Sequence, residues 1–120
     1  MKKIFIINGG QKFGHSGGKF NQTIANATEE FFLNNKNFEV RSTDINDEFD
    51  AAQEVEKFVW ADVIIYHTPI WWFQLPHAFK KYIDVVFTEG HNNGIYKSDG
   101  RSSKNPAINY GTGEMLHRRQ

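Results

Sequence analysis

Residues 2–10 read Lys-Lys-Ile-Phe-Ile-Ile-Asn-Gly-Gly, and this short stretch predicts the fold of the chain. Four consecutive apolar residues, Ile4 to Ile7, end abruptly at the polar turn that begins with Asn8. An unbroken apolar run is typical of a strand that is buried on both faces of a parallel sheet. The start of the sequence therefore predicts a strand that is covered by other elements on both sides.

The residues that follow this strand alternate between helical and extended patterns. Apolar residues recur every three or four positions between 18 and 33, which predicts an amphipathic helix. Runs typical of strands follow at 38–42 and 63–66, and further helical patterns cover 52–59 and 76–90. The order β-α-β-α-β-α predicts an α/β sheet with right-handed crossovers. The residues that set the first helical period are Phe20, Ile24, Ala27 and Phe31.

The composition of the 120-residue chain excludes several classes of protein. The absence of cysteine excludes disulfides, thiolate metal sites and a cysteine nucleophile. Fourteen Lys and Arg balance 14 Asp and Glu, so the basic excess that is usual in nucleic-acid-binding proteins is missing. No apolar run approaches the ~20 residues of a transmembrane helix, and the first run is too short for a signal peptide. We therefore expect one cytoplasmic domain with no transmembrane segment.

The segment from Asn8 to Asn21 is rich in glycine and leads into the first predicted helix. Glycine permits positive φ angles and a close approach of the backbone to a ligand. Free N–H groups and the dipole at a helix N-terminus attract phosphate, and His15, Ser16 and Lys19 add donors. The spacing matches neither a Walker A loop nor a dinucleotide fingerprint. The segment thus predicts either a phosphate site or an ordinary glycine-rich turn with a helix cap.

The segment at 68–73, Thr-Pro-Ile-Trp-Trp-Phe, places three aromatic residues directly after a predicted strand. Such rings can flank a planar ring system, although a hydrophobic plug or a subunit contact would use the same residues. If the strand at 63–66 lies beside the first strand, this segment and the glycine-rich one share a crevice at the carboxyl ends. A phosphate site next to an aromatic wall suggests a nucleotide that carries a flat ring.

Other candidate groups are less informative. The five histidines show no spacing that is typical of a metal site, so no bound metal is expected. Asp44 follows the second predicted strand, where a contact with a nucleotide ribose can occur, but its position favours the start of a loop or a capping role. No grouping of nucleophile, base and acid can be assigned from the sequence.

Several short motifs follow one another along the chain. They are Ile-Ile-Asn-Gly at 6–9, Trp-Ala-Asp at 60–62, Pro-Ile-Trp-Trp at 69–72, Val-Phe-Thr-Glu-Gly-His at 86–91 and Ser-Asp-Gly-Arg at 98–101. Together these motifs resemble the modulator of drug activity B family of bacterial NAD(P)H:quinone reductases. That family has a flavodoxin-like fold and is related to mammalian quinone reductase.

The resemblance implies FAD as cofactor, NADPH or NADH as hydride donor, a quinone as acceptor, and a homodimer. It implies that His15 to Asn21 holds the pyrophosphate and adenosine side of FAD, and that Pro69 to Phe73 lines the isoalloxazine. The flavin supplies the chemistry, so the resemblance assigns no catalytic residue. The cofactor-binding residues that it implies are His15, Ser16, Gly17, Gly18, Lys19, Phe20, Asn21, Pro69, Ile70, Trp71, Trp72, Phe73 and Tyr110.

The C-terminal residues depart from the family pattern. Family members continue after a Tyr-Gly-x-Gly motif with an apolar strand, whereas here residues 110–113 precede a charged segment at 114–120. We expect a flavodoxin-like parallel sheet over 1–113, with helices on both faces, strand order 2-1-3 and the later strands missing by truncation. The third strand would then be an exposed apolar edge. We therefore expect weak FAD binding and little turnover.

Two other functions are compatible with the sequence. One is an FMN-binding electron carrier of the flavodoxin type, whose phosphate loop is normally short and rich in hydroxyl groups. The single serine among Gly, Lys and His residues here favours the dinucleotide reading. The other is a non-catalytic, truncated remnant that dimerises through its exposed surface.

Overall fold

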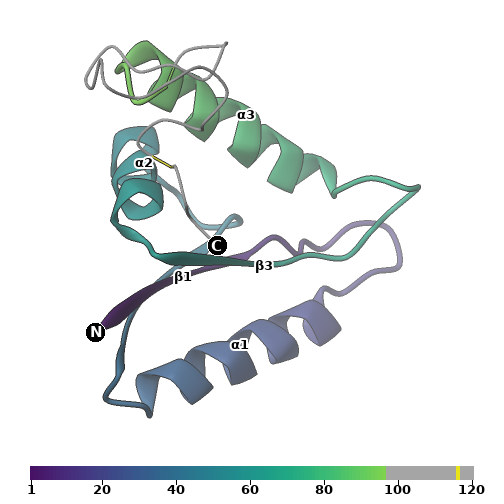
Figure 1. Ribbon diagram of the computed structural model, residues 1–120. Helices are drawn as coiled ribbons and strands as arrows, with labels where there is room; N and C mark the ends of the chain where they lie inside the picture. The colour runs from purple at the N-terminus through teal and green to yellow at the C-terminus, as the bar shows by residue number, and fades with distance from the viewer. Residues whose placement is uncertain (97–115, 117–120) are drawn as a thin grey trace.

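The computed structural model describes residues 1–96 and Leu116, and in this part the chain alternates strands with helices (Figure 1). Each strand and helix that the sequence predicts is present. In chain order they are β1 (Lys2–Asn8), α1 (Lys19–Leu33), β2 (Phe38–Asp44), α2 (Ala51–Trp60), β3 (Val63–His67) and α3 (His77–Asn92).

The three strands form a parallel sheet with the order β2-β1-β3. The run from Ile4 to Ile7 lies on the central strand, and each of its side chains is at most 2% exposed. This burial on both faces is what the unbroken apolar run predicts. The predicted α/β class and the predicted strand order are confirmed.

Strand β3 is less buried than its apolar sequence predicts. Val63, Ile64 and Ile65 are half-buried, and Tyr66 is 44% exposed. The reason is the position of the strand, because in the described part of the chain β3 pairs with β1 and forms the edge of the sheet. The third strand is therefore an exposed edge in the described part of the chain, as expected from the sequence.

The helices cover the two faces of the sheet unequally. Figure 1 shows α1 on one face, with α2 and α3 on the other. The main apolar core lies under α2 and α3, where the rings of Phe5 and Phe58 meet edge to face with centroids 5.1 Å apart. α3 contributes Phe79, Tyr82 and Val86 to this core, at the three- and four-residue spacing that the sequence predicts.

A buried carboxylate joins three elements on the same side of the sheet. Glu54 of α2 is 3% exposed and accepts hydrogen bonds from the Thr43 and Tyr82 hydroxyls, each at 2.7 Å. Its other oxygen lies 2.7 Å from the Lys57 ammonium. Burial and the hydrogen bond to Glu54 raise the pKa of Tyr82 well above its usual value, so this hydroxyl stays protonated and continues to donate.

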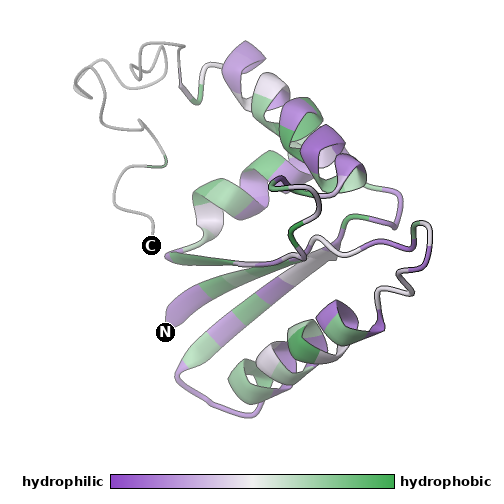
Figure 2. Ribbon diagram, turned by 90° about the vertical axis from the view of Figure 1, so that its right-hand side faces the viewer, coloured by the Kyte–Doolittle hydropathy of each residue, from purple (hydrophilic) through white to green (hydrophobic). Residues whose placement is uncertain are grey.

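α1 does not turn its most apolar stripe toward the sheet. Figure 2 shows hydrophobic residues along this helix, yet Phe20 and Phe31 are 82% and 65% exposed, whereas Ala25 is buried. Asn21 hydrogen-bonds to Asn8 at the end of β1, which fixes the rotation of the helix with Asn21 and Ala25 toward the sheet. The predicted helical period of this segment is confirmed, but the apolar stripe from which it was inferred lies outside the core.

α3 continues through His91 and Asn92, two residues beyond the helical pattern that the sequence predicts at 76–90. The helix ends where the Asn93 N–H donates to the Glu89 carbonyl and Gly94 takes a φ of +71°.

No helix of the described residues is long and apolar enough to cross a bilayer. Tyr110, the motif at 98–101 and all of the 114–120 segment except residue 116 lie outside the described residues.

Candidate functional site

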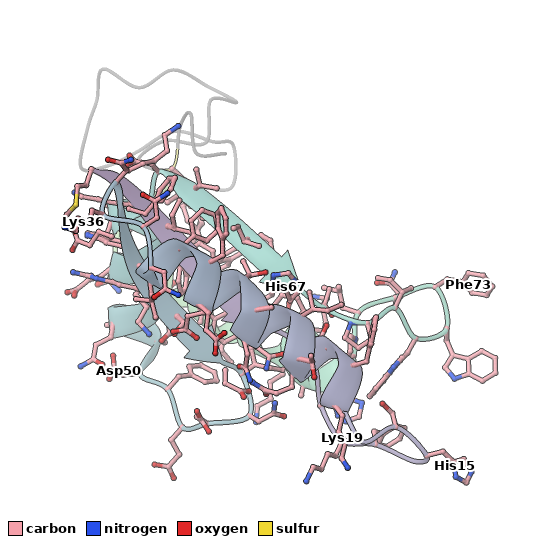
Figure 3. The ribbon with its side chains drawn as sticks, turned by 90° about the horizontal axis from the view of Figure 1, so that it is seen from below. His15, Lys19, Lys36, Asp50, His67 and Phe73 are labelled. Atoms are coloured by element: carbon pink, nitrogen blue, oxygen red, sulfur yellow. The ribbon has the colours of Figure 1, made fainter. Side chains whose placement is uncertain are left out.

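The carboxyl ends of the three strands lie at one end of the sheet. Asn8 of β1 is in register with Asp44 of β2 and with His67 of β3. Figure 3 shows His15 and Phe73 at the tips of two loops that project beyond this end. Ligands of parallel α/β sheets bind beyond the carboxyl ends of the strands, so both predicted binding segments lie where a ligand is expected.

The glycine loop (residues 9–18) connects β1 to α1 and contains a tight turn. The Phe13 N–H donates to the Ser16 carbonyl at 3.1 Å, and the Ser16 N–H donates to the Phe13 carbonyl at 2.9 Å. Gly14 takes a φ of +56° at the first central position, where glycine has no steric penalty. The turn places His15 at the tip and returns the chain toward α1.

The start of α1 is suited to an anion. Gly18 occupies the N-cap with a φ of +71° and has no side chain with which to cap the first N–H groups. The first turn contains no acidic residue and begins with the exposed Lys19. A Cβ atom at Gly17 would meet only Lys19 Cγ, at 3.8 Å, so the backbone there is open to a ligand. These features favour a phosphate group.

A network of carboxamides forms the floor of this region. The Asn8 Oδ1 accepts hydrogen bonds from the Asn21 amide at 2.6 Å and from the Gly10 N–H at 3.1 Å. The Asn8 amide donates to Gln22 at 2.7 Å, and Asn21 also donates to the His67 carbonyl at 3.0 Å. The network therefore fixes the start of α1 to the ends of β1 and β3.

Two hollows flank the start of α1. The first, of about 500 Å³, lies between α1 and the end of β3. The second, of about 610 Å³, reaches Asp44 and Asn46 after β2. Gly17, Gly18 and Lys19 border both hollows. The first hollow is lined by Ser16, Gly17, Gly18, Lys19, Phe20, Asn21, Ile24, Tyr66, His67, Thr68 and Pro69.

The aromatic loop (residues 68–76) connects β3 to α3 and contains a second tight turn. Backbone hydrogen bonds of 2.8 and 3.0 Å join Trp71 to Gln74. The two residues between them, Trp72 and Phe73, have φ angles of +50° and +66° and are 92% and 96% exposed. Positive φ at both central positions is the pattern of a type I′ turn, which favours Asn and Gly. Bulky side chains are held here against their backbone preference, which is typical of functional loops.

The two loops contact each other through aromatic side chains. Phe13 stacks on Trp71 with ring centroids 5.8 Å apart, and it forms a T-shaped pair with His77 with centroids 4.9 Å apart. These contacts join segments that are about sixty residues apart in the sequence. The aromatic loop and the glycine loop therefore form a single structural unit.

Two residues of β3, Tyr66 and His67, border the first hollow. The Tyr66 ring lies beside Phe79 of α3, with centroids 5.9 Å apart, and burial raises the pKa of its hydroxyl. The Nε2 atom of His67 is buried and has no hydrogen-bond partner in the described residues. No cluster of metal-ligating side chains occurs in the part of the chain that the structure describes.

The structure brings together some, but not all, of the residues that the sequence predicts for the site. The segment from Ser16 to Asn21 and Pro69 line the first hollow together. His15 and the residues from Ile70 to Phe73 line neither hollow, because the two turns carry them beyond it. Tyr110 lies outside the described residues.

Sequence reasoning missed several residues of this region. Asn8 and His67 end β1 and β3, and Gln22 and Ile24 lie one turn into α1. The rule that ligands bind at strand carboxyl ends could have identified Asn8 and His67. Asp44 borders the second hollow, and its Oδ1 accepts hydrogen bonds from the N–H and the side-chain amide of Asn46, so it both begins a loop and faces a cavity.

Comparison with known proteins agrees with this geometry. A family model described as a flavodoxin-like fold matches residues 2–118. The chain belongs to this flavodoxin-like family. The predicted fold class and the predicted resemblance are thereby confirmed.

Relatives of this flavodoxin-like chain include named quinone oxidoreductases. The chain is 43% identical over 113 residues to the NADPH:quinone oxidoreductase MdaB of Haemophilus influenzae. The matched residues cover 94% of this chain and 58% of that protein. An uncharacterized protein of Schizosaccharomyces pombe is 47% identical over 115 residues, or 96% of this chain and 58% of that protein. The chain thus spans little more than half the length of these relatives.

Two further comparisons are more distant. An FMN-dependent NADH:quinone oxidoreductase of Halalkalibacterium halodurans is 40% identical over 58 residues, which is 48% of this chain and 28% of that protein. A crystal structure of a proposed quinone reductase from Klebsiella pneumoniae superposes with a TM-score of 0.58 at 20% identity, over 72% of this chain and 46% of that one. This structure supports the flavodoxin-like fold alone.

Proposed function

We propose that this chain forms part of a flavin-dependent NAD(P)H:quinone oxidoreductase. The observation that carries the proposal is the first hollow, where an uncapped helix N-terminus and the loop after β3 border the same cavity. Exposed aromatic rings project from the same end of the molecule. The names of the Haemophilus and Halalkalibacterium relatives support the reaction class.

The residues of the site suit each chemical part of a flavin nucleotide. The open backbone at Gly17, the first N–H groups of α1 and Lys19 suit its phosphate groups. Thr68 and Pro69, the first residues of the aromatic loop, would lie against the planar ring system. His67 and Thr68 complete the border of the hollow beside the end of β3.

The second hollow favours FAD over FMN within this proposal. FAD carries an adenosine half in addition to the half that FMN contains. The second hollow, on the β2 side of Gly17 to Lys19, provides about 610 Å³ of further space. Lys12 and Asp44 at its border suit a phosphate and a ribose hydroxyl, respectively.

The protein contributes binding, orientation and exclusion of water. A bound flavin would supply the hydride chemistry between a nicotinamide and a quinone. The carboxamide network around Asn8 and Asn21 would hold the phosphate end in a fixed place relative to β3. Trp72 and Phe73 lie on an exposed turn outside the apolar core, so their rings are free to cover a bound ring system and shield it from water.

A homodimer and a cytoplasmic location belong to the same proposal. The exposed rings of Trp72 and Phe73 leave apolar surface that a second subunit could cover. Sedimentation of the purified protein with bound flavin would measure the oligomeric state.

Cofactor analysis of the purified protein tests the proposal. We expect flavin absorbance after saturation with FAD, release of FAD on heating, and quinone reduction that depends on NADPH or NADH. Gly17→Ala should weaken FAD binding, whereas Gln53→Ala at an exposed position on α2 should not. A folded protein that takes up neither FAD nor FMN at millimolar concentration would contradict the proposal and favour a non-catalytic, dimerising protein.

The second candidate is an FMN-dependent protein, either an oxidoreductase or an electron carrier. The name of the Halalkalibacterium relative favours it, because that protein is described as FMN-dependent. Calorimetric titration with both flavins distinguishes the candidates. FAD should bind more tightly if the second hollow holds the adenosine half, and FMN should bind at least as tightly if that hollow is not used.

A further inference from the structure

We infer that Gln11 is a positioning residue that fixes the glycine loop and the aromatic loop to each other. Gln11 lies in the glycine loop but is only 8% exposed. Its side chain crosses to the start of α3, where the aromatic loop ends. For its effect on a ligand, this inference rests on the proposed flavin site.

The first contact of Gln11 is a helix cap supplied from a distant segment. The N-cap of α3 is Pro76, which has no side-chain hydrogen bond to offer. The Ala78 N–H donates instead to the Gln11 Oε1 at 2.8 Å, across 67 positions of sequence. One of the orphan N–H groups at the start of α3 is therefore satisfied by the glycine loop.

The second contact of Gln11 is with the adjacent histidine. The Gln11 Nε2 lies 3.1 Å from the His77 Nε2. The His77 ring forms a T-shaped pair with Phe13, which in turn stacks on Trp71. A continuous row of contacts thus runs from Gln11 through His77 and Phe13 to the turn of the aromatic loop.

Gln11 also contacts the phosphate end of the glycine loop. A Cβ atom at Gly18 would lie 3.4 Å from the Gln11 carbonyl, so the N-cap of α1 packs directly on the Gln11 backbone. The backbone of this residue thus supports the start of α1 while its side chain caps α3. A change in the Gln11 side chain would therefore alter the distance between the start of α1, which is the phosphate end of the site, and the aromatic loop, which is its aromatic end.

This geometry predicts a specific pattern in ligand affinity. FAD must reach both the phosphate end of the site, at the start of α1, and the aromatic end, at the aromatic loop. ADP needs only the phosphate end, and riboflavin needs only the aromatic end. Misplacement of a binding group by about 1 Å can cost as much as 100-fold in function. Gln11→Ala should therefore weaken FAD binding about tenfold or more and riboflavin binding less than about threefold. The loss for ADP should be smaller than the loss for FAD, although Gln11 also borders the second hollow.

The experiment is calorimetric titration of the full chain with FAD, ADP and riboflavin. Gln11→Glu is the conservative variant, because a carboxylate oxygen still accepts the Ala78 N–H and is favoured at a helix N-terminus. Gln53→Ala, at an exposed position on α2, is the matched control. We expect Gln53→Ala to bind all three ligands as the wild type does. Gln11→Glu is used in the hydrogen-exchange experiment alone, because Gln11 also borders the second hollow and a carboxylate there would oppose the phosphate groups of FAD and ADP. Equal losses for FAD, ADP and riboflavin in Gln11→Ala, or no loss for FAD, would overturn the inference.

Amide hydrogen exchange tests the same inference without a ligand. In Gln11→Ala we expect faster exchange in both loops together, at Phe13 and Ser16 and at Trp71 and Gln74, with protection restored in Gln11→Glu. Faster exchange in only one loop, or in neither, would show that Gln11 does not connect them. If the wild type binds no flavin, the proposed function fails, and the exchange data still decide the role of Gln11.

Discussion

At the scale of single residues, the site depends on backbone conformations that the sequence reveals only partly. Gly17 and Gly18 are adjacent and both border the two hollows, but they do so for different reasons. Gly18 has a φ of +71°, whereas Gly17 lies outside the positive-φ region and faces open space. The two glycines can therefore be separated by mutation.

The first prediction concerns this glycine pair. Gly18→Ala should lower the free energy of unfolding by roughly 1–2 kcal/mol, because a side chain is strained at positive φ. Gly17→Ala should leave stability within about 0.5 kcal/mol and lower the affinity for FAD, since its methyl group enters the space offered to the phosphate. Urea denaturation and flavin titration measure the two effects. Equal destabilisation by both substitutions would contradict this assignment.

The second prediction concerns Trp72 and Phe73 in the turn of the aromatic loop. Replacing them together by Asn and Gly should raise the free energy of unfolding by about 1–2 kcal/mol, because these residues accept positive φ and the lost rings are almost fully exposed. The same variant should bind flavin more weakly. Thermal denaturation with flavin titration measures both quantities. A variant that is less stable than the wild type would show that the rings have a structural role.

At the scale of elements, the Glu54 carboxylate holds α2, α3 and β2 together through Tyr82, Thr43 and Lys57. This group was not evident from the sequence, where Glu54 is one of several acidic residues on a helix. Its burial became clear only from the packing of α3 against α2. The hydrogen bond from Tyr82 has a consequence at alkaline pH.

The third prediction is a loss of stability above about pH 10 that depends on Tyr82. An unfolded tyrosine releases its proton near pH 10, whereas folded Tyr82 retains it because its pKa is raised. The folded state then binds more protons than the unfolded state, so the free energy of unfolding falls as pH rises. The slope from this residue approaches about 1.4 kcal/mol per pH unit. Denaturation between pH 8 and 11.5 should show a shallower fall for Tyr82→Phe, and parallel curves would refute the role of Tyr82.

At the scale of the whole molecule, the two faces of the sheet differ in what they contribute to stability. The face under α2 and α3 holds the aromatic core, including Phe58, which is 2% exposed. The opposite face is covered by α1, whose apolar stripe remains exposed. The resulting surface of α1 runs beside the end of β3, because Phe20 and Ile24 border the same hollow as Tyr66.

The fourth prediction compares these two faces. Phe58→Ala should cost about 3–5 kcal/mol in the free energy of unfolding, because it leaves a cavity among packed rings. Phe31→Ala should cost about 1 kcal/mol or less, since this ring is 65% exposed and has one edge contact with Phe32. Chemical denaturation of both variants measures the difference. A cost above about 3 kcal/mol for Phe31→Ala would show that the stripe is buried in solution.

The sequence by itself determined which elements form and in what order. The unbroken run from Ile4 to Ile7, the three-to-four spacing of Phe79, Tyr82 and Val86, and the motifs of the flavodoxin-like family depend on local chemistry and on hydrophobic periodicity. It also located both loops of the candidate site, because glycine and aromatic clusters after strands are local signals. These features required no knowledge of long-range contacts.

Only the tertiary structure decided which side chains face each other. The rotation of α1, which depends on the hydrogen bond between Asn21 and Asn8, placed the apolar stripe outside the core. The pairing of Gln11 with Ala78 joins positions 67 residues apart, and no local pattern in the sequence encodes such a contact. The physical reason is that hydrophobic periodicity shows which face of a helix or strand is apolar. Which element packs against that face depends on the packing and hydrogen bonds of the complete fold.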